Sequence, residues 1–196
     1  MLDKSLEYRN LLMRRPAGEP IHEAKLPPGY TFGLYQVGDE AHWARIETAV
    51  LEFDDEAQAL ECVRRDYLDF HGESSRRMLF IREPGGLPVA TFTAWWQYTG
   101  QRRDPWVHWV GVHPEHQSRG LGRAIVAQGV RLMADIEGDR DFYLHTQTWS
   151  HRAVGLYLWA GFRFLPDGQS AGGSPNENAV GLEVLRRAGF TYLNAH

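Results

Sequence analysis

The sequence predicts a mixed α/β fold in which helices cover a central sheet, and two observations support this prediction. The first is the order of segments along the chain: a strand, two helices, three strands, a helix, a strand, a helix and another strand. The second is the run from Trp106 to Ala124, where a Val- and Trp-rich strand leads through a Gly-rich turn into an amphipathic helix. Such elements bury their apolar faces against each other.

Periodicity and turn residues predict the individual elements. A short amphipathic helix is expected over residues 6–13 and a Pro- and Gly-containing linker after it. Asp54 or Asp55 is expected to cap the second helix of the domain, and Ser150 a later one that Gly161 ends. The expected strands cover residues 30–37, 78–82, 88–97, 105–113, 141–149 and 162–165, and the expected helices residues 40–50, 55–70, 121–136 and 151–160.

The chain of 196 residues suits one domain with appended segments. We expect an appendage and linker at residues 1–28 and the domain itself at residues 29–166. Residues 167–196 are expected to form a flexible loop, then a helix and a last strand over residues 190–193, all packing on the same domain.

Composition excludes several classes of protein. The net charge of −4 argues against a nucleic-acid binder that relies on phosphate contacts. No stretch approaches the roughly 18 apolar residues of a membrane span, and the N-terminus lacks a signal-peptide pattern. The single Cys62 excludes an intrachain disulfide and indicates a reducing, cytoplasmic setting. His113-x-x-His116 lacks further ligands, so no metal site is expected.

The turn between the central strand and its helix has the chemistry of a phosphate site. Glycine lets an anion approach the backbone closely, and the first N–H groups of a helix point at it. Arg119 and Arg123 would add charge-assisted hydrogen bonds. The turn lacks the Lys-Ser/Thr of a nucleotide P-loop and the third glycine of a dinucleotide fold. An ordinary helix start is the alternative interpretation.

Val112-x-Pro114 followed by Gln117-x-x-Gly120-x-Gly122-x-Ala124 resembles the acetyl-CoA pyrophosphate loop of the GNAT superfamily of N-acetyltransferases. That loop follows the family's central fourth strand. The resemblance implies a mixed, mostly antiparallel, twisted sheet, flanked by helices and splayed between the fourth and fifth strands. It also implies that acetyl-CoA contacts Val110, Gly111, Val112, Gln117, Ser118, Arg119, Gly120, Leu121, Gly122, Arg123 and Ala124.

A second motif, Ser150-x-x-Ala153-x-x-x-Tyr157-x-x-x-Gly161-Phe162, resembles the family signature in the helix after the fifth strand. There the first residue is usually Asn and holds the pantetheine arm, and the tyrosine protonates the leaving CoA thiolate. The resemblance implies cofactor contacts for Ser150, Ala153 and Tyr157 and the acid role for Tyr157. Ser150 departs from the family's Asn, which weakens its assignment. The alternative for Tyr157 is a half-buried core aromatic.

The acceptor amine must lose a proton, and His108 is our candidate base. Its ordinary pKa of about 6.5 suits proton abstraction near neutral pH. His108 also matches, by its distance before the loop, a catalytic histidine in a related N-acetyltransferase. A structural histidine in the sheet is an equally weighted alternative. Rival bases are Glu52, Asp54 and Asp55, and many relatives use only water.

The acceptor itself is indicated only in outline. Trp96 and Trp109 lie on strands expected to be neighbours and could contact an aromatic or aliphatic amine, and Glu52 and Asp54 would favour a cationic group. The sequence therefore predicts an acetyl-CoA-dependent N-acetyltransferase that acts on the primary amine of a small molecule, without a metal. The alternatives are a non-catalytic acyl-CoA-binding or sensing module and a protein or peptide N-acetyltransferase. Homodimerisation through the terminal appendages is a further prediction.

Overall fold

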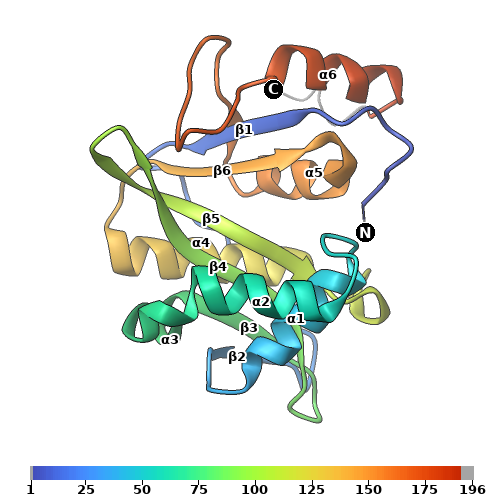
Figure 1. The fold of residues 1–196 in the computed structure, drawn as a ribbon, viewed down its shortest axis with the longest axis vertical. Coiled ribbons are helices and arrows are strands. Elements are labelled where there is room, and N and C mark those ends of the chain that lie inside the picture. Colours follow the sequence, from blue (N-terminus) through green and yellow to red (C-terminus); the bar gives the residue numbers. More distant parts are fainter. Residues whose placement is uncertain (1, 191–196) are drawn as a thin grey trace. The chain divides into compact units, whose positions relative to one another are not determined.

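The computed structural model describes residues 2–190, and these residues form two compact units (Figure 1). Unit 1 contains His22–Trp95 and His108–Ile136, and unit 2 contains Leu2–Ile21, Trp96–Val107 and the chain from Glu137 onward. Two long strands, β4 (Pro88–Thr99) and β5 (Arg102–Val112), contribute residues to both units.

Unit 1 combines three antiparallel strands with most of the helices. β2 (Thr31–Leu34) pairs with β3 (Met78–Arg82), and β3 pairs with β4. The helices are α1 (Asp39–Ala49), α2 (Glu56–Asp66), α3 (His71–Arg77) and α4 (Leu121–Glu137), whose last residue already belongs to unit 2. Trp43, Phe80 and Phe92 are fully buried, so large aromatic side chains fill the space between these helices and strands.

Unit 2 contains β1 (Asn10–Arg15), β6 (Phe142–Gln147), β7 (Arg163–Phe164), α5 (His151–Trp159) and α6 (Asn178–Arg187). β1 lies between β6 and β7 and runs antiparallel to both. β5 and β6 are parallel and pair at Trp106 and Tyr143. The hydrogen-bonded order of the seven strands is β2-β3-β4-β5-β6-β1-β7, which confirms the mixed, mostly antiparallel α/β fold. The splay beyond the Trp106–Tyr143 pair stays a prediction.

The helix expected over residues 6–13 is wrong, because Asn10–Arg15 form strand β1. Leu11, Leu12 and Met13 are all completely buried, so both faces of this strand lie in the core. A strand buried on both faces shows a continuous apolar run, which periodicity cannot distinguish from a short helix.

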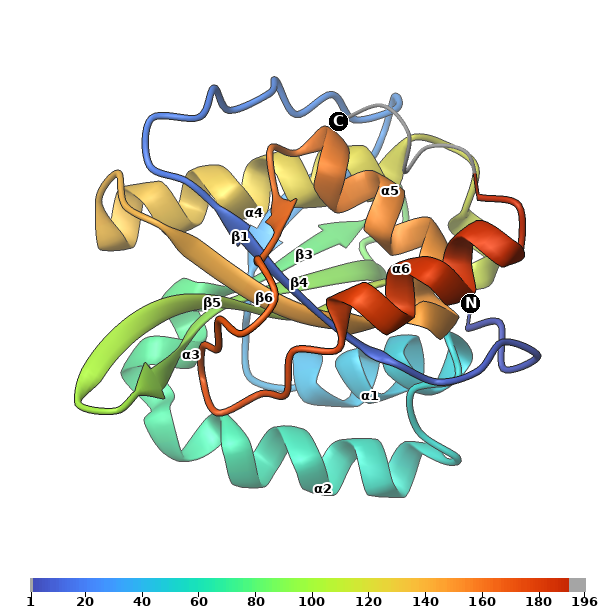
Figure 2. The same cartoon turned by 90° about the horizontal axis from the view of Figure 1, so that it is seen from above.

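α6 holds β1 in this position, as Figure 2 shows from above. Asn178, the first residue of α6, accepts a hydrogen bond from the Leu12 N–H and donates to the Leu12 and Leu165 carbonyls, each at 2.8 Å. Glu177 accepts a bond from the Asn10 N–H. The buried amide of Asn178 thus connects α6 to β1, which lies more than 160 residues earlier in the chain. No local sequence pattern predicts this role.

The remaining elements agree closely with the expected ones. Asp55 caps α2, since its side chain accepts a bond from the Gln58 N–H at 2.9 Å. The second helix ends at Asp66 rather than near residue 70, and α3 follows it. At the end of α5, Gly161 has φ +92° and the Phe162 N–H bonds to the Tyr157 carbonyl, a Schellman ending. The last strand expected over residues 190–193 lies beyond the described residues.

Candidate active site

The turn before α4 has the backbone that the phosphate hypothesis requires. Ser118 and Gly120 have positive φ angles of 60° and 83°, and the first intrahelical bond runs from the Ala124 N–H to the Gly120 carbonyl. The N–H groups just before Ala124 have no carbonyl one turn earlier in the helix. Ser118, Arg119 and Gly120 are exposed, so these groups lie at the surface of unit 1. The turn therefore fits an anionic ligand such as a pyrophosphate.

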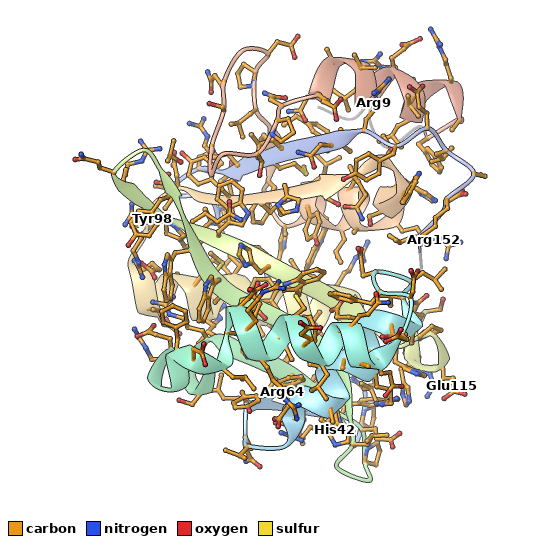
Figure 3. All side chains as sticks on the ribbon, viewed as in Figure 1. Arg9, His42, Arg64, Tyr98, Glu115 and Arg152 are labelled. Carbon is orange, nitrogen blue, oxygen red and sulfur yellow. The ribbon has the colours of Figure 1, made fainter. Side chains whose placement is uncertain are left out.

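Arg119 is held beside this turn by two hydrogen bonds. Its guanidinium donates to the Tyr30 hydroxyl at 3.1 Å and to the Glu115 carbonyl at 3.0 Å. The Glu115 carboxylate is exposed and is labelled on this turn in Figure 3. The Gln117 side chain donates to the Val112 carbonyl at 2.8 Å and so ties the turn back to the end of β5.

β5 changes conformation at Trp109, just before Val110, Gly111 and Val112, which the resemblance assigns to acetyl-CoA contacts. Trp109 has φ +47°, which is strained for a bulky side chain. Its indole is fixed by ring contacts with Trp43 at 5.4 Å and Phe53 at 5.2 Å between centroids. The left-handed backbone of β5 is therefore at Trp109, two residues before Gly111.

Gly111 is glycine for a different reason. A Cβ atom at this position would lie 2.8 Å from Glu47 Oε1 and 3.0 Å from Ile46 Cγ2. Both distances are too short for a relaxed contact, so a Cβ atom here would push the Glu47 carboxyl and the Ile46 side chain away from β5.

Tyr67 lies between His108, the candidate base, and Trp109, a candidate acceptor contact, which are neighbours on β5. Its hydroxyl accepts a hydrogen bond from Trp109 Nε1 at 2.8 Å and lies 2.7 Å from His108 Nδ1. Burial, above all, raises the pKa of Tyr67, so the hydroxyl keeps its proton. Both contacts are satisfied when the hydroxyl oxygen accepts from Trp109 Nε1 and the O–H donates to His108 Nδ1. In a neutral His108 the proton is then on Nε2, which leaves no free lone pair for an incoming amine.

Sequence reasoning missed Glu47, which lies on α1 beside Gly111. It is 1% exposed, and its Oε1 has no hydrogen-bond partner in the described part of the chain. Burial raises its pKa well above the ordinary value, and the charge of Glu52 adds to this effect. Glu47, Tyr67, His108, Trp109 and Gly111 are called the Glu47 cluster below. Glu47 lies four residues after the buried Trp43, so helical spacing could have indicated that it is buried too. A glutamate, however, is rarely fully buried, and this argued for an exposed position.

The acidic residues Glu52, Asp54 and Asp55 lie in the loop between α1 and α2 and differ in exposure and contacts. Asp55 caps α2, and both of its carboxyl oxygens accept hydrogen bonds from Gln58. Asp54 is exposed and Glu52 is half-buried in the same loop. Both proposed acceptor contacts therefore lie in unit 1 with Trp109.

Unit 2 contains the residues of the second motif. Tyr157 is 6% exposed on α5 and forms an edge contact with Phe162. Ser150 stands at the N-cap position of α5 but makes no capping bond through its side chain, so its hydroxyl is not committed to the helix start. Ala153 is half-buried one turn before Tyr157. Trp96 also belongs to unit 2, where the Arg103 guanidinium lies 4.8 Å from its ring.

Within residues 2–190, no three His, Cys, Asp or Glu side chains group as metal ligands would. His116 instead contacts the Tyr30 hydroxyl through Nδ1 at 3.0 Å. None of the helices in this part of the chain has the length and apolar character needed to cross a membrane.

Comparison with protein families gives this arrangement a context. The model of the acetyltransferase (GNAT) family matches residues 40–162, which include the turn, the Glu47 cluster and Tyr157. The chain belongs to this family. A protein named mycothiol acetyltransferase from Streptomyces bingchenggensis is 35% identical over 157 residues, which cover 76% of this chain and 49% of the relative. One of the same name from Salinispora tropica is 30% identical over 80% of this chain and 53% of the relative. The chain thus spans about half the length of these curated relatives.

Solved structures support the same fold. A GCN5-related N-acetyltransferase from Sphaerobacter thermophilus has a TM-score of 0.59 at 22% identity, over 81% of this chain and 50% of that one. A tandem GNAT protein from the clavulanic acid biosynthesis pathway has a TM-score of 0.56 at 14% identity, over 79% and 50%. At these identities the likeness concerns the fold alone.

Proposed function

We propose that the chain is an acetyl-CoA-dependent N-acetyltransferase that acts on the primary amine of a small molecule. The observation that carries this proposal is the turn before α4, where two positive φ angles and a helix N-terminus leave backbone N–H groups for a pyrophosphate. The relatives named mycothiol acetyltransferase make mycothiol-related amines the first acceptors to test.

The proposed chemistry is direct attack of the amine on the thioester. The C–N bond forms, the C–S bond breaks, one proton leaves the amine for a base and another reaches the departing thiolate. The backbone of Val110, Gly111 and Val112 is assigned to the carbonyl oxygen as it gains charge. Tyr157 keeps the acid role that the family motif implies, with Ser150 and Ala153 as cofactor contacts. His108 is the sequence-based candidate for the base, alongside Trp96, Trp109, Glu52 and Asp54 as acceptor contacts.

Calorimetry of acetyl-CoA binding tests the donor site. Gly120→Pro cannot adopt the φ of +83°, so we expect it to abolish binding. Gly138→Pro is the matched control, because Gly138 at the other end of α4 has φ +79° and equally open surroundings. Equal loss of affinity in both variants, or no binding to the wild type, would remove the proposal.

Release of free thiol from acetyl-CoA in a screen of amines then separates an enzyme from an acyl-CoA-binding module. Tyr157→Phe should slow thiol release by about 100-fold or more while acetyl-CoA binding persists, since positioned acids contribute about that much. An unchanged rate in Tyr157→Phe would exclude the tyrosine as the acid.

We also propose a cytoplasmic setting and a homodimer. Burial raises the pKa of the single Cys62 to about 12, so this thiol is protonated and unreactive near neutral pH. A chain with one unreactive thiol and no possible intrachain disulfide is consistent with a reducing environment. Light scattering that gives a monomer mass at every concentration would contradict the dimer.

A further inference from the structure

The buried carboxyl group of Glu47 lacks a hydrogen-bond donor for its Oε1 atom within the described residues. A buried carboxyl oxygen without a hydrogen-bond donor is costly, and proteins rarely keep one without a use. Oε1 of Glu47 is such an atom within the described residues. The Trp43 Nε1 atom, one turn earlier on the same face of α1, is also buried without a partner there. This face of α1 therefore presents an unsatisfied acceptor and an unsatisfied donor.

The position of Glu47 connects it to the reaction. Its Oε1 lies within contact distance of Gly111, the middle one of the three backbone positions assigned to the thioester carbonyl. Position 111 carries no side chain, so the backbone of Gly111 faces this oxygen directly. A cation bound at Oε1 would therefore lie next to the acetyl group, provided the proposed function holds.

The surroundings of Glu47 favour a cation as its partner. Glu52 in the next loop adds negative charge near Glu47, and Glu47 in turn acts electrostatically on Cys62 of α2 and on Tyr67 just after α2. These groups are anionic or neutral. Trp43, one turn before Glu47, makes tilted or edge-on ring contacts with Phe53 and Trp109, and aromatic faces of this kind suit an ammonium group with an apolar substituent.

We propose that Glu47 binds the ammonium group of the acceptor and takes its first proton, so that it is a catalytic residue of the acetyl transfer. The carboxylate becomes a neutral acid as the ammonium group becomes the amine nucleophile. Tyr157 protonates the departing thiolate, and the second amine proton returns through solvent to the tyrosine oxygen. His108 is then a positioning residue, which fixes Trp109 through the Tyr67 hydroxyl.

The direct test is a titration of the Glu47 carboxyl carbon by NMR in the full chain. The signal is assigned by comparing ¹³C-glutamate-labelled wild type with Glu47→Gln, and CoA is present throughout. Methylammonium should lower the pKa of Glu47, because the charged carboxylate gains a donor. Tetramethylammonium, which has no N–H, should have a smaller effect. Equal shifts with both cations, or no shift with either, would overturn the proposal.

Kinetics give a second, independent readout with the best acceptor of the amine screen. In Glu47→Gln we expect at least about a 100-fold loss of kcat/KM and loss of the acid limb of the pH profile. Glu61→Gln, an exposed residue on α2, is the matched control and should behave like wild type. Loss of the acid limb in His108→Gln but not in Glu47→Gln would return the base role to His108.

Binding of acetyl-CoA separates the two proposals. Glu47→Gln should bind acetyl-CoA like the wild type, since Glu47 is assigned only to the acceptor. If the wild type fails to bind acetyl-CoA, the proposed function falls, whereas a normal pH profile with intact acetyl-CoA binding in Glu47→Gln removes only the role of Glu47.

Discussion

The turn before α4 and the Glu47 cluster belong to the same unit but are built in opposite ways. The turn is exposed and works through backbone, with Gly120 needed for its φ of +83°. The cluster is largely buried and works through side chains, with Gly111 needed because α1 leaves no room for a Cβ atom. The comparison shows that two glycines nine residues apart serve conformation in one case and space in the other.

The largest expected difference is between Gly111→Ala and Gly120→Ala, because the first should impair turnover of the amine and the second the binding of acetyl-CoA. In Gly111→Ala the new Cβ displaces Glu47, and we expect amine turnover to fall by about 100-fold, as displacements near one ångström can cost. In Gly120→Ala the Cβ meets no atom within 4 Å, so only the backbone is strained and acetyl-CoA affinity should weaken instead. Steady-state kinetics with both substrates varied measure the difference. The same kinetic defect in both variants would contradict it.

Tyr67→Phe should reveal how far the Glu47 cluster depends on side-chain bonds. The change leaves Trp109 Nε1 and His108 Nδ1 without the hydroxyl between them, and we expect it to lower the free energy of unfolding by about 1–3 kcal/mol. Urea denaturation measures the loss. Tyr35→Phe is the control: Tyr35 is half-buried, its hydroxyl donates to the Glu40 carboxylate, and its loss should cost less. Equal losses would mean that the cluster has no special dependence on Tyr67.

The pH dependence of stability should report the burial of Glu47. Because its folded-state pKa is raised, both states are protonated below the ordinary value of 4.5, and only the unfolded state ionises just above it. The free energy of unfolding of the wild type should therefore decline relative to Glu47→Gln as the pH rises above 4.5, until the folded carboxyl also ionises. Urea melts at a series of pH values measure this decline. A difference that does not change with pH would contradict the raised pKa.

Arg119→Ala should give the smallest effect, because the backbone rather than the side chain is assigned to the phosphate. We expect acetyl-CoA affinity to fall by about 3- to 10-fold, and less at high salt. Arg131→Ala, exposed on the same helix, removes the same charge away from the turn and should leave the affinity unchanged. Calorimetry at two ionic strengths decides between a contact of Arg119 and a general effect of charge.

Local patterns were sufficient for most elements and for the turn. The strand, Gly-rich turn and amphipathic helix depend on neighbours in the sequence, so the start of α4 at Leu121 follows from residues 112–124. The capping of α2 by Asp55 and the end of α5 at Gly161 are local for the same reason.

Local patterns failed where burial is decided by distant partners. Leu11, Leu12 and Met13 form a strand rather than a helix because β6 and β7 supply its hydrogen bonds from more than 120 residues away. His108 was assigned by its place on a strand, but its Nδ1 contact is with Tyr67, just after the end of α2.

The sequence by itself determined the α/β fold, the family and the backbone of the turn before α4, because each depends on the order and spacing of nearby residues. Only the tertiary structure revealed β1 in the sheet, Asn178 across its neighbours and the buried carboxyl of Glu47 against Gly111. The physical reason is that burial and pKa depend on which distant residues exclude water from a group, and the packing of the folded chain decides this.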